Sequence, residues 1–137
     1  MEQSGFISTQ NKGFRMHFNN GFAISVQFGS FNYCSRKNYD DKVSKDLVSP
    51  KDSDFWTAGS AEVAVFDTNN RKQEYSDVGM ISLGQDTVAG WLSSDQVAKV
   101  ITIVQSAKTL NEIQTKLKAL KIWMDTKQIF TNVMYLR

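Results

Sequence analysis

Apolar and polar residues alternate in two neighbouring stretches near the start of the chain, and this alternation predicts two strands that each have one apolar face. The apolar positions are Phe14, Met16, Phe18, Phe22, Ile24, Val26 and Phe28. A two-residue turn at Asn20-Gly21 would oppose Phe18 to Ala23 and mix the two faces, whereas a three-residue loop over 19–21 opposes Phe18 to Phe22. Because directly opposed residues share a face, the longer loop is the one that keeps every large apolar side chain on one side. The sequence therefore predicts a hairpin over 14–28, with Gly21 at the loop position that favours a left-handed backbone.

Further strands and two helices follow along the chain. Residues 61–66 alternate clearly and predict a third strand, and residues 79–91 predict one or two shorter ones. Residues 94–107 and 110–121 carry apolar residues at helical spacing. Because strands come first and helices later, the predicted fold class is α+β, an N-terminal antiparallel sheet followed by two C-terminal helices.

The two predicted helices also carry start signals. Ser93 is followed three residues later by Gln96, and Thr109 is followed at the same spacing by Glu112. This is the spacing of a capping box, in which the two side chains satisfy each other's free backbone N–H groups.

Three segments lack such patterns, although 137 residues suit a single domain spanning 1–137. Residues 1–12 are polar and predict a loose arm. Residues 30–59 predict a long loop, since they are rich in Ser, Asn, Asp and Lys and contain the chain's one proline. The last nine residues hold six large apolar side chains, at 129, 130 and 133–136. Because chain ends are usually polar, this tail favours a homo-oligomer, most simply a dimer, over packing on its own domain.

Composition excludes several function classes. A hydrophobic fraction of 41% and an aromatic fraction of 12% exclude a disordered chain. Sixteen basic against fourteen acidic residues give a formal charge of +2, which is too even to indicate nucleic-acid binding by itself. One cysteine and one histidine leave too few ligands for a standard metal site, so no metal or other cofactor is expected. The start of the sequence lacks the features of a signal peptide, and no apolar run reaches the roughly 18 residues of a membrane span, which predicts a cytosolic protein.

Candidate catalytic residues are sparse. Cys34 could act as a nucleophile with His17, its one possible histidine partner, and a loop pair, Asp40 and Asp41, could do acid–base work. The ordinary reading is a small buried thiol, an exposed strand histidine and solvated loop charges. No residue is therefore assigned a catalytic role.

Candidate binding residues are easier to find. Tyr33, Arg36, Lys37 and Tyr39 interleave aromatic rings with cations, a combination that suits stacking on bases and holding phosphates. The polar face of the predicted hairpin, which carries Arg15, His17, Ser25 and Gln27, could also line a site. The alternative is a surface loop whose aromatic residues pack onto the sheet, together with an ordinary half-solvated sheet face.

Three spaced motifs occur along the chain: G-F-x-M-x-F-x-N-G-x-x-x-S-V-Q-x-G-x-x-N-Y-C, then A-E-x-A-x-x-D, then D-x-V-x-G-W. The residues that form them are Gly13, Phe14, Met16, Phe18, Asn20, Gly21, Ser25, Val26, Gln27, Gly29, Asn32, Tyr33, Cys34, Ala61, Glu62, Ala64, Asp67, Asp86, Val88, Gly90 and Trp91. In these motifs the chain resembles a family of small, largely uncharacterised bacteriophage proteins. The resemblance covers residues 12 to about 104 and departs from the family between Arg36 and Ser60, and in the second helix and tail. It implies a phage origin and the host cytoplasm, and no activity.

Together these observations favour a phage accessory protein without catalytic activity that binds a host protein or a small host-made ligand, for example in counter-defence. The alternative is a nucleotide- or nucleic-acid-binding module that uses the Tyr33–Tyr39 loop. A hydrolase is a third possibility.

Overall fold

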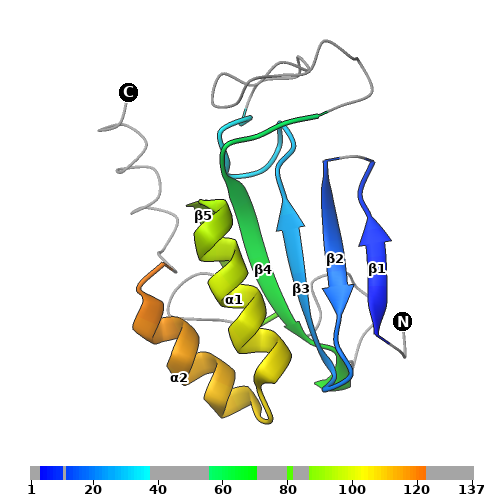
Figure 1. Ribbon diagram of the computed structural model, residues 1–137, viewed down its shortest axis with the longest axis vertical. Coiled ribbons are helices and arrows are strands. Elements are labelled where there is room, and N and C mark those ends of the chain that lie inside the picture. The colour runs from blue at the N-terminus through cyan, green and yellow to red at the C-terminus, as the bar shows by residue number, and fades with distance from the viewer. Residues whose placement is uncertain (1–3, 11, 38–55, 71–79, 82–86, 123–137) are drawn as a thin grey trace.

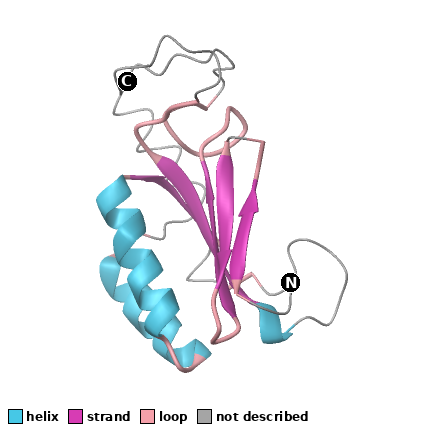
Figure 2. Cartoon of the chain, turned by 45° about the vertical axis from the view of Figure 1, so that its right-hand side comes forward, coloured by secondary structure: helices cyan, strands magenta, loops and turns pink. Residues whose placement is uncertain are grey.

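An antiparallel sheet with two helices against one of its faces forms the part of the chain that the computed structural model describes, residues 4–10, 12–37, 56–70, 80–81 and 87–122. The strand order is β1-β2-β3-β4-β5. Figure 1 shows α1 lying across the sheet with α2 beside it, and Figure 2 shows both helices on the same side. The elements are β1 (Gly5–Ser8), β2 (Gly13–His17), β3 (Phe22–Gln27), β4 (Ala61–Asp67), η1 (Thr68–Asn70), β5 (Val88–Leu92), α1 (Ser94–Ser106) and α2 (Leu110–Leu120). The predicted α+β class is confirmed.

The predicted hairpin register is also confirmed. Phe14 lies opposite Val26, and Met16 lies opposite Ile24. The backbone N–H of Phe18 donates to the carbonyl of Phe22 at 2.9 Å, which closes the three-residue loop. All the large apolar side chains of the hairpin therefore face the helices.

Gly21 occupies the loop position that the register assigned to it, with φ at 87°. A Cβ atom there would collide with the side-chain amide of Asn69. We expect Gly21→Ala to lower the free energy of unfolding by at least about 1 kcal/mol, because alanine is disfavoured at positive φ. Gly21→Asn meets the same collision at its Cβ atom but should cost less in the backbone, since asparagine tolerates this region better. Chemical denaturation of both variants checks this, with Asn19→Ala as the exposed control in the same loop, and an unchanged Gly21→Ala would contradict the loop assignment.

The main core lies between the sheet and the helices. Ile24, Val63 and Val65 from the central strands are fully buried, and α1 and α2 cover them. The buried helical residues are Val97, Val100, Val104, Ile113 and Leu117. These positions repeat at three- and four-residue spacing, so one face of each helix is apolar.

Both helix start signals form caps. The Ser93 hydroxyl accepts from the N–H of Gln96 at 3.2 Å, and the Gln96 side chain accepts from the N–H of Ser93 at 2.9 Å. Thr109 caps α2 in the same way, but Glu112 accepts from the N–H of Lys108 instead of that of Thr109. That N–H, followed by the Lys116 ammonium, lowers the pKa of the Glu112 carboxyl.

The end of α1 is held by a residue from the distant hairpin loop. The Asn20 side-chain amide donates to the carbonyls of Val104, Gln105 and Ala107 at 2.8, 3.1 and 2.9 Å. The same side chain accepts from the N–H of Phe22 at 3.0 Å. Since the last carbonyls of a helix have no partner within the helix, Asn20 acts as a C-terminal cap supplied from another part of the fold.

One sequence expectation needs correction. Residues 1–12 are not simply a loose arm, because Gly5–Ser8 form β1, in which Phe6 lies opposite Met16 on β2. In the predicted strand region 79–91, Met80 forms one isolated bridge with Phe66, and a regular strand begins at Val88.

The described parts of the 30–59 loop, residues 30–37 and 56–59, carry no helix or strand. Neither described helix is long and apolar enough to cross a membrane. The apolar residues at 129–136 lie outside the described residues.

Candidate functional site

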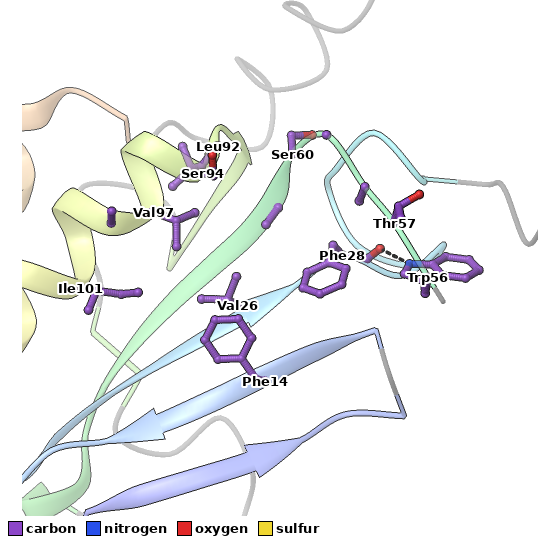
Figure 3. A pocket seen from close by; sticks show the side chains of 14 residues that line it. Phe14, Val26, Phe28, Trp56, Thr57, Ser60, Leu92, Ser94, Val97 and Ile101 are labelled. Carbon is purple, nitrogen blue, oxygen red and sulfur yellow. Dashed lines mark hydrogen bonds between the residues drawn. The ribbon is translucent and has the colours of Figure 1, made fainter. Parts of the chain in front are cut away.

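A cavity of about 430 Å³ opens between the sheet and α1, near the start of the helix. Phe14, Val26 and Phe28 line it from the hairpin, and Val97 and Ile101 reach it from α1, as Figure 3 shows. The rest of the lining is Trp56, Thr57, Ala58, Gly59, Ser60, Ala61, Leu92, Ser94 and Ala98. Four separate stretches of the chain therefore meet here.

The lining is apolar and uncharged. Aromatic rings from Phe14, Phe28 and Trp56 form part of its wall, and aliphatic side chains from α1 and β3 form much of the remainder. Among the lining residues, the polar side chains are the hydroxyls of Thr57, Ser60 and Ser94. The cavity can therefore bury an apolar part of a ligand away from water. Its lining offers hydroxyl groups for a few hydrogen bonds but no charged side chain to pair with an ionic ligand.

Trp56 is held in this wall from several directions. Its indole N–H donates to the carbonyl of Phe28 at 2.8 Å, the dashed line in Figure 3. The guanidinium carbon of Arg36 lies 3.7 Å from the centre of the indole ring, and the Lys12 ammonium lies 4.7 Å from it. Both distances are in the range of cation–π contacts, so two cations fix the ring that borders the cavity.

The segment after Trp56 is joined to the 29–37 loop by a reciprocal pair of hydrogen bonds. The N–H of Ser35 donates to the Ser60 hydroxyl, and the N–H of Gly59 donates to the Ser35 hydroxyl, each at 2.9 Å. The Glu62 carboxylate also accepts from the N–H of Tyr33 at 2.9 Å and from the Asn32 amide at 3.3 Å. These bonds position a cavity wall that has no regular secondary structure.

The structure places three of the four predicted loop residues, and Tyr39 lies outside the described residues. Arg36 is 2% exposed and stacks on Trp56. The Tyr33 ring lies 5.4 Å from that of Trp91, and the Lys37 ammonium lies 4.9 Å from the Tyr33 ring. The interleaved cations and rings therefore pack against one another and against Trp56 and Trp91, and the Arg36 guanidinium is buried instead of facing solvent.

Arg15 and His17 lie on the sheet face opposite the helices, away from the cavity. That face is not an open polar surface, because Ala23, Ala64 and Phe66 form a second buried cluster there. The Arg15 guanidinium stacks 4.2 Å from the centre of the Phe66 ring. His17 is 6% exposed, so the expected exposed strand histidine is wrong. The small side chains of Ala23 and Ala64 leave room for the larger side chains of Arg15, His17 and Phe66 to pack along this face of the sheet.

Cys34 is buried in the 29–37 loop, where its thiol donates to the carbonyl of Gly29 at 3.3 Å. Burial raises the pKa of the thiol, which keeps it protonated at neutral pH. His17 ends β2 beside the 19–21 loop, at the other end of the hairpin from Gly29. The structure therefore does not bring Cys34 and His17 together. Among the described residues, no group of three or more His, Cys, Asp or Glu side chains could hold a metal ion.

No protein-family model, curated protein or solved structure matches this chain. The cavity residues were missed in the sequence because they follow no single period. Val26, Val97 and Ile101 read as ordinary core positions, and Trp56 lies in a stretch without any pattern. The one available signal was a tryptophan among small and polar residues, in the sequence Trp56-Thr-Ala-Gly-Ser60.

Proposed function

We propose that this protein is a non-catalytic binding protein whose ligand is a small, uncharged and largely apolar molecule held in the cavity between the sheet and α1. The observation that carries the proposal is the cavity itself, at about 430 Å³ with an apolar lining. This volume lies within the range of pockets that bury small ligands. The resemblance to bacteriophage proteins supports a ligand made by the host cell, and a role as a phage accessory protein that sequesters it.

The lining argues for an uncharged ligand. A carboxylate or phosphate buried against it would lose its hydration and find hydroxyl groups in place of a cation, which costs several kcal/mol. The rings of Phe14, Phe28 and Trp56 favour a ligand with a planar ring, because offset and edge-to-face aromatic contacts are attractive. The hydroxyls of Ser60 and Ser94 could fix the orientation of one polar substituent.

A nucleotide is the less favoured ligand. Arg36 is already stacked on Trp56, and the face of Tyr33 is shared with Trp91 and Lys37. A nucleotide would have to displace these contacts before it could stack on the loop. We therefore treat nucleotide binding as an outcome that the test below can detect.

The proposal predicts that filling the cavity from α1 abolishes binding. Ala98 lines the cavity yet is exposed, so Ala98→Phe should place a ring in the opening without disturbing the core. The neutral dye N-phenyl-1-naphthylamine serves as the probe, and we expect the intact protein to enhance its fluorescence. Ala98→Phe should bind the dye with at least about a tenfold weaker affinity, which is a loss of about 1.4 kcal/mol or more in binding free energy. The matched control is Lys99→Phe, an exposed neighbour that does not line the cavity.

The same titration separates the alternatives. Equal dye binding by both phenylalanine variants would contradict the cavity as the site. Competition of the dye by ATP or GMP would favour the nucleotide alternative. Incubation with a nucleotide panel, followed by heat release, tests catalysis, because an altered nucleotide in the released fraction would contradict a purely binding role.

A further inference from the structure

The two edge strands of the sheet, β5 and β1, differ in whether their outer sides are hydrogen-bonded to another segment. At the β5 edge, the N–H of Trp91 donates to the carbonyl of Tyr33 at 2.9 Å, and the Tyr33 ring packs against Trp91. At the other edge, β1 pairs with β2 on one side, and no strand among the described residues pairs with its outer side. In Figure 1, β1 lies at the margin of the sheet, away from both helices.

The hydrogen-bond pattern shows which backbone groups of β1 point outward. The N–H of Thr9 donates to the carbonyl of Gly13 at 2.9 Å, in the turn that joins β1 to β2. Hydrogen-bonded and non-hydrogen-bonded pairs alternate along an antiparallel ladder, so Ile7 and Gly5 also direct their backbone groups toward β2. The N–H and C=O groups of Phe6 and Ser8 therefore point away from the sheet.

The side chains of β1 do not block pairing of this edge with another strand. Phe6 is 74% exposed on the helix side of the sheet, and Ile7 is 40% exposed on the other side. Residues 4–10 contain no charged residue and no proline. Exposed edge strands of monomeric proteins usually carry a lysine, a proline or a bulge that prevents further pairing. Residues 4–10 carry no such charge or proline, and the shortness of the four-residue strand is the one protective feature of this edge. This edge is therefore a candidate for pairing with a further strand.

We propose that β1 pairs antiparallel with β1 of a second copy of this chain, about a two-fold axis at Ile7. A two-fold contact places a strand against itself, so it requires a strand without like charges, and residues 4–10 meet this requirement. The pairing joins the two sheets into one continuous sheet. It also covers the strand's exposed apolar side chains on both faces.

The position of the axis follows from the outward-pointing groups. With the axis at Ile7, Phe6 pairs with Ser8 of the second copy and Ser8 with Phe6, which gives four hydrogen bonds within the two strands. An axis at Phe6 would instead pair Ser8 with Ser4, which precedes β1. Ile7 then faces Ile7 of the second copy as a non-hydrogen-bonded pair, with Cα atoms about 4.5 Å apart.

The test is the mass of the particle in solution, measured by light scattering after size exclusion at about 100 µM. We expect a dimer for the intact chain and a monomer for Ser8→Pro. The Ser8 N–H points outward, so proline removes two of the four intermolecular hydrogen bonds and none of the β1–β2 ladder. Phe6→Lys, which adds a charge to the edge, should also be a monomer, with an unchanged circular dichroism spectrum. Phe31→Lys is the matched control, because Phe31 is 92% exposed and lies outside β1.

Cross-linking tests the register. Cys34 is buried, so Ile7→Cys introduces one accessible thiol, which should form an intermolecular disulfide across the two-fold axis under mild oxidation. Phe31→Cys is the control and should cross-link far less. A monomeric intact chain would overturn the proposal, as would a dimer that survives both Ser8→Pro and Phe6→Lys. Loss of the dimer on deletion of residues 127–137, with both β1 variants still dimeric, would assign the interface to the C-terminal segment instead.

Discussion

Asn20→Ala is expected to lower the free energy of unfolding by about 2–3 kcal/mol, more than any other single change in the hairpin loop. The Asn20 amide donates to three carbonyls at the end of α1, two of them in partly buried surroundings. Truncation leaves these acceptors without the partner, and each unsatisfied buried polar group costs about 1–3 kcal/mol. The N–H of Phe22 loses its acceptor as well. Urea denaturation monitored by circular dichroism measures the change.

The neighbouring asparagine supplies the control. Asn19 is exposed and lies in the same loop, so Asn19→Ala should change stability by less than about 0.5 kcal/mol. Asn20→Asp is the sharper variant, because it keeps the acceptor for Phe22 but points a negative charge at the negative end of the helix dipole. It should be at least as destabilising as alanine at pH 7, and part of the loss should be recovered at acidic pH as the carboxyl is protonated. A stable Asn20→Asp variant would contradict the capping role.

The sequence predicted the elements whose signals are local. The hairpin register follows from alternation and one glycine, and both helices follow from capping residues and spaced apolar positions, all within windows of about 15 residues. Contacts between distant segments were not predictable in this way. Asn20 reads as turn chemistry, and nothing near it indicates that its side chain reaches carbonyls more than 80 residues away. β1 was missed because four residues are too few to establish a period.

The candidate site was harder to predict than the fold. Interleaved tyrosines and cations have the same sequence signature whether they bind a ligand or one another, and burial decides between the two. Arg36 illustrates this, since its partner Trp56 lies 20 residues further along in a stretch without periodicity. The cavity depends on how α1 and the 56–60 segment approach the hairpin, which is a property of the tertiary structure.

The second large effect is expected at Arg36. Arg36→Ala should lower the free energy of unfolding by about 2–4 kcal/mol, because it removes a buried side chain and a desolvated cation–π contact at once. Lys37→Ala is the matched control, since Lys37 is also a cation over an aromatic ring but is partly exposed. It should cost less than about 1 kcal/mol. Thermal and urea denaturation of the two variants measure the difference.

Arg36 also connects stability to binding, because the ring that it holds is part of the cavity wall. Arg36→Ala should therefore weaken binding of N-phenyl-1-naphthylamine, even at temperatures where the variant is fully folded, whereas Lys37→Ala should leave it unchanged. Arg36→Lys is not expected to restore either property, since the planar guanidinium stacks on the indole face and an ammonium does not. If Arg36→Ala kept its stability and its dye affinity but lost nucleotide binding, the guanidinium would have to face a ligand instead of Trp56, and the loop would be the nucleotide site.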